Sequence, residues 1–436
     1  MAVSRKDRQI LRDLAAEVAG IAALPVQQET IARHKALNGL RPVRPMVMID
    51  QVCWHEMNVD DELTPRCEDK FCRDVETRLR RTLYQWKHMR ADMVVEPAID
   101  VLKVIRGMGF GMRVVEETAV TDPANNIVGH FFMDQLANEE DVAKIRMPEV
   151  SLDEKATAAL EEKARGIFDG LLDVRMRGWY PMFAPWDRIV QWRGAEALLM
   201  DMALRPEHTH RIIRRLTDAL TSMLDQLEAQ GLLWGPMNVI HCTGAWTDEL
   251  PASPLVGGDP CVPPLSASRA TKQKEGPHAG GPLQQKAADS WTMSQAQIFS
   301  TVSPAMHDEF EIEYSKDWYA RFGLGYYGCC EPLDDKIDVI RKLPNVRKIS
   351  MSPWVDVERG AERIGRNYVF SRKPAPALLA GEWNPDAVQR DLRRTVDACA
   401  RHGCPCELIL KDISTVCYEP QRLWEWEKIA RRVVGG

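Results

Sequence analysis

The chain has 436 residues, of which 45% are hydrophobic and 28% are charged, and its formal net charge is -6. This composition is typical of a globular protein; it argues against a basic nucleic-acid-binding surface, and no apolar run approaches the roughly 20 residues of a membrane helix. The N-terminus lacks the apolar core of a signal peptide and the eleven cysteines are odd in number, so we expect reduced thiols and a cytoplasmic protein.

Strand-like and helix-like segments alternate along the chain. Residues 5–38 are expected to be helical, so that a helical extension, 1–40, precedes a single domain, 41–436. Apolar runs predict strands at 41–52, 92–101, 174–186, 232–241, 293–302, 322–333, 346–353, 368–374 and 407–416. Helical spacing predicts helices at 69–89, 154–172, 194–204, 207–230, 305–321, 334–342, 355–364, 385–402 and a last one ending near 434. About eight strand–helix units favour a closed (β/α)8 barrel over an open sheet.

One segment departs from this alternation. Residues 251–290 hold seven prolines and five glycines. Such a composition buries too little apolar surface to fold by itself, so we expect a disordered insert or a stretch altered by a reading-frame error.

The run FGLGYYGCCEPL, 322–333, gives the first candidate site. It is an apolar strand that ends in Cys329, Cys330 and Glu331, and parallel sheets carry their sites at the carboxyl ends of the strands. Adjacent strand side chains point to opposite sides, so only one of the two cysteines is expected to face a pocket. Buried cysteines that only pack, and a solvated Glu331, are the alternatives.

Charged residues at other strand ends add candidates. Glu96 and Asp100 share one face of a predicted strand, where an acid costs free energy unless it is paired or used, so one of them is a candidate proton handler and an ion pair is the alternative. Lys373, Lys411 and Asp412 end the last two strands, where they could bind a carboxylate or phenolate or only close the barrel.

Histidines and tryptophans complete the set. His241 follows a predicted strand and suits a metal, while His55 and Glu56 follow the first strand in the same way. Trp186 and Trp354 lie beside candidate site residues and suggest a pocket for a flat ligand, although most tryptophans pack cores.

Six short motifs follow one another in a recognisable order. They are RPVRPMVM (41–48), DMVVEPAID (92–100), FAPWDRIV (183–190), QIFSTVSPAMHDEF (297–310), ISMSPWVDVERGAERIG (349–365) and NYVFSRKPAPALL (367–379). In this order the chain resembles the uroporphyrinogen decarboxylase superfamily over nearly all its length after residue 40. The resemblance implies a (β/α)8 barrel with its site at the carboxyl ends of the strands, and it places Asp100 in the slot of the catalytic aspartate.

The departures from that family limit the activity. Its decarboxylases carry arginines after the first strand to grip the acidic side chains of a porphyrinogen, whereas residues 46–51 contain no arginine and include Asp50. The Gly-His-Gly of the last strand is replaced by residues 413–415. Both departures argue against a tetrapyrrole decarboxylase.

A second branch of the superfamily contains corrinoid-dependent methyltransferases with a zinc site of His-x-Cys and a later Cys. The slot resembles residues 327–329 here, with Tyr327 in the histidine position and Cys329 retained, and Cys417 lies near the slot of the last cysteine. The resemblance implies zinc bound by Cys329 with ligands drawn from Glu331, His241 and Cys417, His55 and Glu96 being further candidates. Three ligands and one open position would suit catalysis.

Three functions follow from these observations. The first is a methyltransferase that moves a methyl group between a small substrate, such as an aryl methyl ether, and a corrinoid on a partner protein. The second is a decarboxylase or other lyase acting on a small carboxylic acid, and the third is a non-catalytic ligand-binding barrel. In the enzymatic hypotheses the catalytic residues are Asp100, Glu96, Lys411 and Asp412, and the substrate-binding residues are His55, Glu56, Trp186, Tyr327, Trp354 and Lys373.

Overall fold

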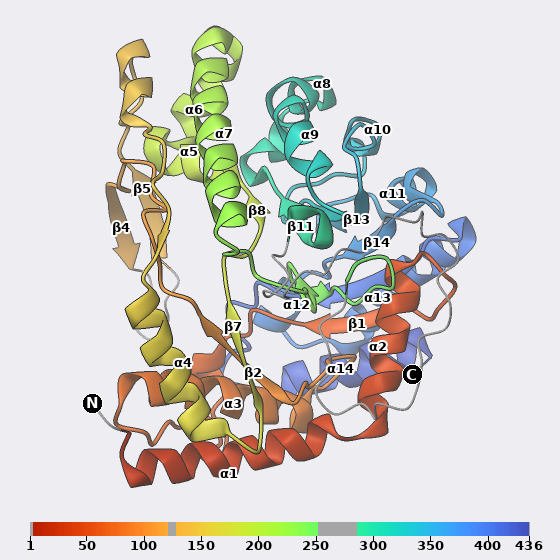
Figure 1. Cartoon of the computed structure of the whole chain (residues 1–436). Helices are drawn as coiled ribbons and strands as arrows, with labels where there is room; N and C mark the ends of the chain where they lie inside the picture. The colour runs from red at the N-terminus through yellow and green to blue at the C-terminus, as the bar shows by residue number, and fades with distance from the viewer. Residues whose placement is uncertain (1–2, 121–127, 252–285, 436) are drawn as a thin grey trace, which may run out of the picture.

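A parallel sheet of seven strands forms the centre of the molecule (Figure 1). The structure is a computed structural model that describes residues 3–120, 128–251 and 286–435. The sheet order is β1-β15-β14-β13-β12-β11-β8. Its strands are β1 (Met46–Ile49), β8 (Met182–Phe183), β11 (Trp291–Ser294), β12 (Leu324–Tyr327), β13 (Val346–Met351), β14 (Val369–Arg372) and β15 (Cys406–Leu410). The parallel pairing confirms an α/β fold.

The two ends of this sheet are linked by a second parallel pair. β2 (Ala98–Leu102) pairs with β7 (Asp173–Arg177), and β7 precedes β8 in the chain by a short turn. Between β1 and β2 the link is made by Asp92, whose backbone N–H donates to Val47 O at 2.9 Å and whose carboxylate accepts from Val47 N at 2.8 Å. Strand pairing therefore does not run unbroken around the described residues, and the predicted complete (β/α)8 barrel is not confirmed.

Helices cover the outside of the sheet. Asp69, Asp153 and Asn384 each accept from a backbone N–H of the first turn and so begin α3, α4 and α13. The helices after residue 40 are α3 (Lys70–His88), α4 (Glu154–Phe168), α5 (Pro185–Arg193), α6 (Ala195–Leu204), α7 (Pro206–Ala229), α8 (Pro304–His307), α9 (Glu313–Ala320), α10 (Ile337–Ile340), α11 (Val357–Ile364), α12 (Ala377–Ala380), α13 (Pro385–His402) and α14 (Gln421–Val434). A π-helix, Asp308–Ile312, joins α8 to α9.

The first 40 residues contain two helices, α1 (Arg5–Ala22) and α2 (Pro25–Asn38), as expected. α1 packs on α3 and α4. α2 lies against the sheet, and its His34 and Asn38 are fully buried. The N-terminal segment is therefore part of the packing around the sheet.

Three short antiparallel strand pairs lie outside the central sheet within the described residues. They are β3 (Ile105–Arg106) with β6 (Ser151–Leu152), β4 (Glu116–Val120) with β5 (Val128–Phe132), and β9 (Val239–Ile240) with β10 (Thr243–Gly244). Short 3-10 helices lie at Trp54–Glu56, Glu139–Lys144, Ala287–Asp289 and Gln297–Thr301. The β4–β5 hairpin projects at one side (Figure 1), in the acidic segment between β2 and α4.

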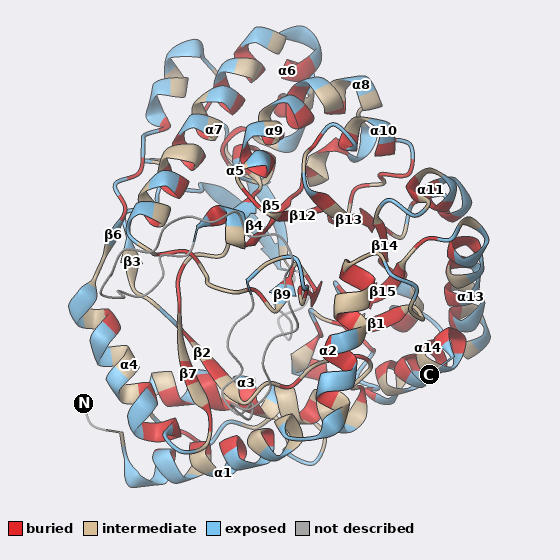
Figure 2. Ribbon diagram, turned by 45° about the vertical axis from the view of Figure 1, so that its right-hand side comes forward, coloured by how far each residue is buried: buried red, intermediate tan, exposed pale blue. Residues whose placement is uncertain are grey.

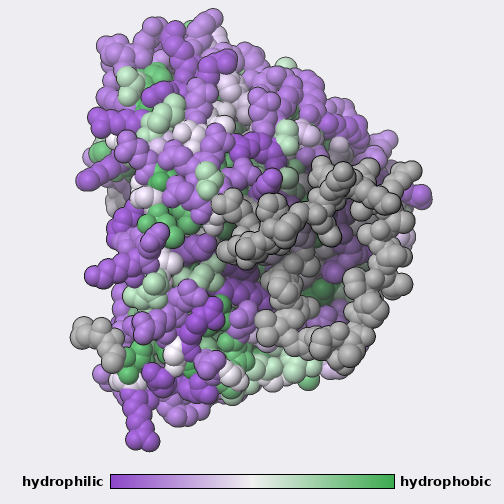
Figure 3. Space-filling model, viewed as in Figure 1, coloured by the Kyte–Doolittle hydropathy of each residue, from purple (hydrophilic) through white to green (hydrophobic). Residues whose placement is uncertain are grey.

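The central strands are buried on both sides, and the helices expose their outer faces (Figure 2). One face of the molecule is largely hydrophilic, with hydrophobic residues in small groups (Figure 3). Within the described ranges, none of the helices combines the length and the apolar character needed to cross a membrane.

Several predicted strands are shorter than expected. The predicted strand 174–186 divides into β7 and β8, and α5 then begins at Pro185, because proline at the first helical position ends a strand and starts a helix. Only Val239–Ile240 of the predicted strand 232–241 is extended in a sheet. Of the insert expected at 251–290, residues 252–285 lie outside the described part of the chain.

Candidate active site

The loops after β12, β14, β15 and β1 meet at one end of the sheet. Backbone strain marks this end: Gln51 and Asp412, which follow β1 and β15, have φ values of 48° and 55°. The loops after β1 and β15 lie side by side, since the backbone N–H of Ile413 donates a hydrogen bond to Gln51 O at 3.2 Å. Positive φ in residues other than glycine costs free energy and is concentrated at functional sites.

Cys329 is held in place through its backbone. Its N–H donates to a Glu331 carboxylate oxygen at 3.0 Å, and its carbonyl accepts from Ser350 Oγ at 2.7 Å. The other oxygen of Glu331 accepts from Ala296 N at 3.0 Å. Glu331 is fully buried, and burial raises its pKa. Both oxygens of Glu331 are thus engaged by backbone N–H groups, so the predicted role of Glu331 as a metal ligand is not supported and its role is to position the cysteine loop.

Gly328 permits this loop to leave the strand. Its φ is +89°, and a Cβ atom there would lie 2.3 Å from Leu333 Cδ1. Only glycine satisfies both the backbone angle and this close packing.

Two thiols, an ammonium and a carboxylate then meet. Lys411 Nζ lies 3.0 Å from Cys329 Sγ, and the two sulfur atoms of Cys329 and Cys330 are 3.4 Å apart. Asp412 lies 3.1 Å from Lys411 Nζ and 3.5 Å from Cys330 Sγ. Cys329 and Lys411 are buried, whereas Cys330 is half-buried and Asp412 is exposed. The four residues form a thiol cluster with one side open to solvent.

The cluster shifts the pKa values of its two thiols in opposite directions. The hydrogen bond from Cys330 and the Lys411 ammonium lower the pKa of Cys329 against the opposing effect of burial. The pKa of Cys330 is raised because it gives its hydrogen bond to Cys329 and is partly buried. Of the two thiols, Cys329 is therefore the one that ionises more readily, and the thiolate is the nucleophilic form of a cysteine.

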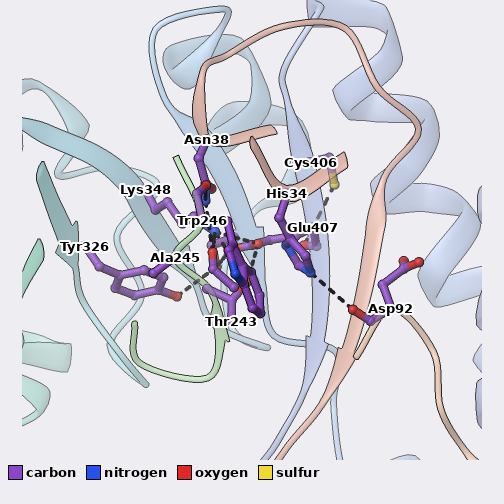
Figure 4. A network of polar contacts seen from close by, with 12 residues as sticks. His34, Asn38, Asp92, Thr243, Ala245, Trp246, Tyr326, Lys348, Cys406 and Glu407 are labelled. Atoms are coloured by element: carbon purple, nitrogen blue, oxygen red, sulfur yellow. Dashed lines mark hydrogen bonds and ion pairs between the residues drawn. The ribbon is translucent and has the colours of Figure 1, made fainter. Parts of the chain in front are cut away.

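A second polar network lies deeper, between the strands (Figure 4). Lys348 and Glu407 form an ion pair of 2.9 Å in which both side chains are fully buried. Glu407 also accepts from Thr243 Oγ1 at 2.6 Å and from Ser371 Oγ at 2.7 Å. Tyr326 Oη lies 2.8 Å from Ser371 Oγ. Charge in the interior is thus compensated by a neighbouring charge and hydroxyl groups.

Two residues of α2, His34 and Asn38, lie beside this network and hydrogen-bond to backbone carbonyls. His34 Nε2 lies 3.1 Å from Asp92 O, and Asn38 Nδ2 donates to the carbonyls of Gly244 and Trp246 at 3.0 and 2.7 Å (Figure 4). Burial lowers the pKa of His34 to about 4, so the imidazole is neutral near neutral pH.

Lys373 joins the thiol cluster to the interior network. Its Nζ donates to Tyr326 Oη and, at 3.2 Å, to Ser371 Oγ. It is buried, and burial lowers its pKa to about 8. The predicted residues that the structure does bring together are therefore Cys329, Lys373, Lys411 and Asp412.

The other predicted metal ligands lie apart from Cys329. Cys417 is exposed and donates to Ala380 O at 3.1 Å. His241 lies in the turn of the β9–β10 hairpin with its ring centroid 5.0 Å from that of Tyr326. In the described ranges no three His, Cys, Asp or Glu side chains are grouped so that they could hold a metal ion. The predicted zinc ligand set does not fit the geometry.

The two strand carboxylates are paired with arginines. Asp100 lies 2.7 Å from Arg177, and Glu96 lies 3.0 Å from Arg175 and 2.6 Å from Asn238 Nδ2. Both arginines come from β7. This arrangement corresponds to the ion pairs considered as the alternative, so neither carboxylate joins the thiol cluster.

The predicted aromatic residues lie elsewhere. Tyr327 is fully buried and its hydroxyl contacts His307 Nε2, on the side of the strand opposite to Tyr326. Trp186 is fully buried against Phe299, so it is a core residue. The side chain of Trp354 is 79% exposed. The structure therefore does not bring Tyr327, Trp186 and Trp354 together around one pocket.

His55 and Glu56 lie at a cavity that the residues of the thiol cluster do not line. Burial would raise the pKa of Glu56, but hydrogen bonds from Thr415 and from the backbone N–H groups of Tyr418 and Val416 lower it overall. His55 lies 3.4 Å from Glu56 and lines a cavity of about 480 Å³ with Ile413. Glu56 organises the loop after β15, and His55 remains a candidate binding residue.

The interior network was not predicted from the sequence. Glu407 is the single charge in β15, and Lys348 follows Arg347 in the otherwise mostly apolar β13. A charge within an apolar strand is the signal that singled out Glu96 and Asp100. The same rule applied to every strand would have found both residues.

Comparison with known proteins adds little. No protein-family model matches the chain, and no curated protein matches it. Among solved structures, a methyltransferase from Methanosarcina mazei is similar, with 10% sequence identity, a TM-score of 0.44, and coverage of 93% of this chain and 98% of that chain. At this identity and TM-score, the activity must be argued from the side chains of the chain itself.

Proposed function

We propose that this protein is a methyltransferase in which the Cys329 thiolate receives a methyl group from a small methylated substrate, such as an aryl methyl ether. The methyl group then passes to a corrinoid carried by a partner protein, which acts as the second substrate. The observation that carries the proposal is the 3.0 Å contact between Lys411 Nζ and Cys329 Sγ at the carboxyl end of the sheet.

The environment of Cys329 suits nucleophilic attack on carbon. A thiolate is a strong nucleophile, and its formation here is favoured by Cys330 and the Lys411 ammonium. Only 5% of the Cys329 surface is exposed, so the sulfur is shielded from bulk water that would weaken it as a nucleophile. The resemblance of the strand-end motifs to the methyltransferase branch of the superfamily supports the same reaction.

The proposed step balances as a displacement. The Cys329 sulfur forms a bond to the methyl carbon, and the bond between that carbon and the substrate oxygen breaks, its electron pair passing to the oxygen. Lys411 or solvent gives a proton to that oxygen. In the second transfer the reduced corrinoid, as the acceptor, supplies the electron pair of the new bond to the methyl carbon. The S–C bond breaks and its electron pair returns to Cys329, which the Lys411 ammonium stabilises as a thiolate.

Zinc has no step in this proposal. The predicted ligands Glu331, His241 and Cys417 do not gather at Cys329, and the Lys411 ammonium occupies the position beside the sulfur. The stabilising charge that a zinc ion would supply to a thiolate comes here from the ammonium.

The test uses methyl-labelled methoxybenzoates, methyl sulfides and methylamines with the purified full chain, and chemically reduced free cobalamin as a surrogate acceptor. We expect mass spectrometry to find the labelled methyl group on Cys329 before acceptor is added, and visible absorbance to report methylcobalamin afterwards. Cys329→Ser should abolish both signals, and Lys411→Met should slow the first.

Cys417→Ser is the matched control, because Cys417 is an exposed cysteine outside the cluster. It should leave both signals unchanged. Methyl transfer by Cys329→Ser at the wild-type rate, or a panel of donors that never methylates Cys329, would contradict the proposal.

A further inference from the structure

Three lysines reach the interior and the carboxyl end of the sheet, and their partners differ. Lys348 is paired with Glu407, and Lys411 with Cys329 and Asp412. Lys373 forms hydrogen bonds only to hydroxyl groups: among the described residues its Nζ has Tyr326 and Ser371 as partners and forms no ion pair with a carboxylate. The same Nζ lies 5.0 Å from the centre of the Tyr326 ring. It is buried to 3% exposure. A buried ammonium without a carboxylate partner is costly, and this cost favours the neutral amine.

The hydroxyl groups around Lys373 form a directed chain. Ser371 donates to Glu407 at 2.7 Å, so the bond of 2.8 Å between Tyr326 and Ser371 has Tyr326 as its donor, and Tyr326 in turn accepts from Lys373. Protons can therefore move between Lys373 and the Glu407 carboxylate along hydrogen bonds that already exist.

An unsatisfied group lies next to this chain. His241 Nε2 is buried and has no hydrogen-bond partner among the described residues, although its ring lies 5.0 Å from that of Tyr326. The backbone of His241 has a φ of 53°, and its N–H donates to Tyr180 Oη at 2.7 Å. A buried nitrogen without a partner calls for a specific explanation, and a polar ligand beside Tyr326 supplies one.

From this geometry we propose that Lys373 is a carbonyl-reactive amine that forms an iminium with a small aldehyde or ketone, with Tyr326 as the proton-transfer group and His241 Nε2 as a hydrogen-bond partner of the bound compound. The amine nitrogen attacks the carbonyl carbon, and the π electron pair moves to oxygen, which takes protons and leaves as water. In sum, one carbonyl compound and one protonated lysine side chain give one protonated imine and one water molecule. The positive iminium can then accept an electron pair from a neighbouring bond of the substrate.

Other charged groups near the amine agree with this role. Burial and the Lys411 ammonium lower the pKa of Lys373, whereas Cys242, Glu407 and Cys329 act in the opposite direction, and the net pKa is about 8. The ammonium of a second lysine is a recognised means of keeping an amine reactive. The pKa of His241 is lowered by burial and by both lysines, so its imidazole is neutral and Nε2 is free to accept or donate.

This activity goes beyond methyl transfer and does not require Cys329. Reductive trapping tests it: the full chain is incubated near pH 7.5 with acetaldehyde or with pyruvate and sodium cyanoborohydride, and modified lysines are located by peptide mass spectrometry. An amine with a pKa of about 8 has roughly a hundredfold more neutral form at that pH than an ordinary lysine. We expect Lys373 to be modified at least tenfold faster than Lys155, an exposed lysine of α4.

The variants separate this proposal from the methyltransferase proposal. Lys373→Met should lose the adduct, Tyr326→Phe should slow its formation about tenfold, and Cys329→Ser should still form it. Adducts spread over exposed lysines with Lys373 unmodified in the wild-type chain would overturn the inference, and that result needs no variant to fold. Equal trapping rates in Tyr326→Phe and wild type would overturn the role of Tyr326.

Discussion

Lys411 Nζ lies 3.0 Å from Cys329 Sγ, although the two residues are 82 positions apart in the chain. β12 and β15 bring them to the same end of the sheet, because parallel strands present their carboxyl ends together. Burial alone would raise the pKa of the thiol, whereas the Cys330 hydrogen bond and the Lys411 ammonium lower it overall.

Removing the ammonium should therefore slow alkylation of Cys329. We expect Lys411→Met to react with iodoacetamide about tenfold more slowly near pH 7, which corresponds to a rise of about one unit in the thiol pKa. The rate is measured by peptide mass spectrometry across a pH series, and the midpoint of the profile should move to higher pH. Lys411→Arg keeps the charge and is the matched control; an unchanged midpoint in Lys411→Met would contradict the assignment.

The buried pair of Lys348 and Glu407 should dominate the stability of the interior. Lys348→Met leaves the Glu407 carboxylate without its countercharge, at a cost of about 3–5 kcal/mol in the free energy of unfolding. Lys348→Met combined with Glu407→Leu removes both charges and should recover most of that loss. Urea unfolding of the wild type, the single variant and the double variant measures these losses. A double variant as unstable as the single one would show that the ion pair itself stabilises the fold, and that the loss in Lys348→Met is not caused by the isolated charge of Glu407.

Asp92 should make stability depend on acid pH. Burial would raise its pKa, but two hydrogen bonds from Arg44, of 2.7 and 2.9 Å, and one from Val47 N lower it overall. Because the folded pKa lies below the unfolded value of about 3.9, the stabilisation is complete above that value and is lost as pH falls through the folded pKa. Asp92→Asn should cost about 2–3 kcal/mol near neutral pH and progressively less in acid. A difference that stays constant down to the acid transition would contradict this.

The residues at the carboxyl ends of the strands could be predicted from the sequence, because the pattern that marks them lies within a few consecutive residues. A Cys, Lys or Asp directly after an apolar run marks a strand end, and Cys329, Lys373 and Lys411 were found in this way. Period-two alternation says that Tyr326 and Tyr327 face opposite sides, but not which of them contacts Ser371 and Lys373; the prediction named Tyr327, whereas Tyr326 makes these contacts. That choice depends on the packing of the helices around the sheet.

The pairings of charged residues could not be predicted from the sequence. Asp100 meets Arg177 only because β2 and β7 are parallel neighbours in one particular register. The contact of Lys348 with Glu407 likewise requires strands separated by β14 in the sheet. The closed barrel was inferred from the number of strand–helix units, yet the link between β1 and β2 depends on the side chain and backbone of Asp92.

Gly328 provides a test of how the cysteine loop is positioned. Gly328→Ala introduces a Cβ that would lie 2.3 Å from Leu333 Cδ1 and imposes a φ of +89° on alanine. The backbone angle alone costs about 1–3 kcal/mol, and the steric overlap adds to it. We expect lower stability and slower alkylation of Cys329, because the loop must shift and move the sulfur away from Lys411.

A double-mutant cycle with Leu333→Ala separates the two causes. Leu333→Ala removes the overlapping methyl group, so the double variant should lose less stability than the sum of the single losses, by about 1 kcal/mol or more. The part that remains beyond the Leu333→Ala loss is due to the backbone angle and to the contact with Ser350 Cβ, which would lie 3.2 Å from the added Cβ. If the stability losses of the two single variants simply add in urea unfolding, the loop avoids Leu333 when Cβ is added. Alkylation of Cys329 at the wild-type rate in Gly328→Ala would show that this glycine does not position the thiol.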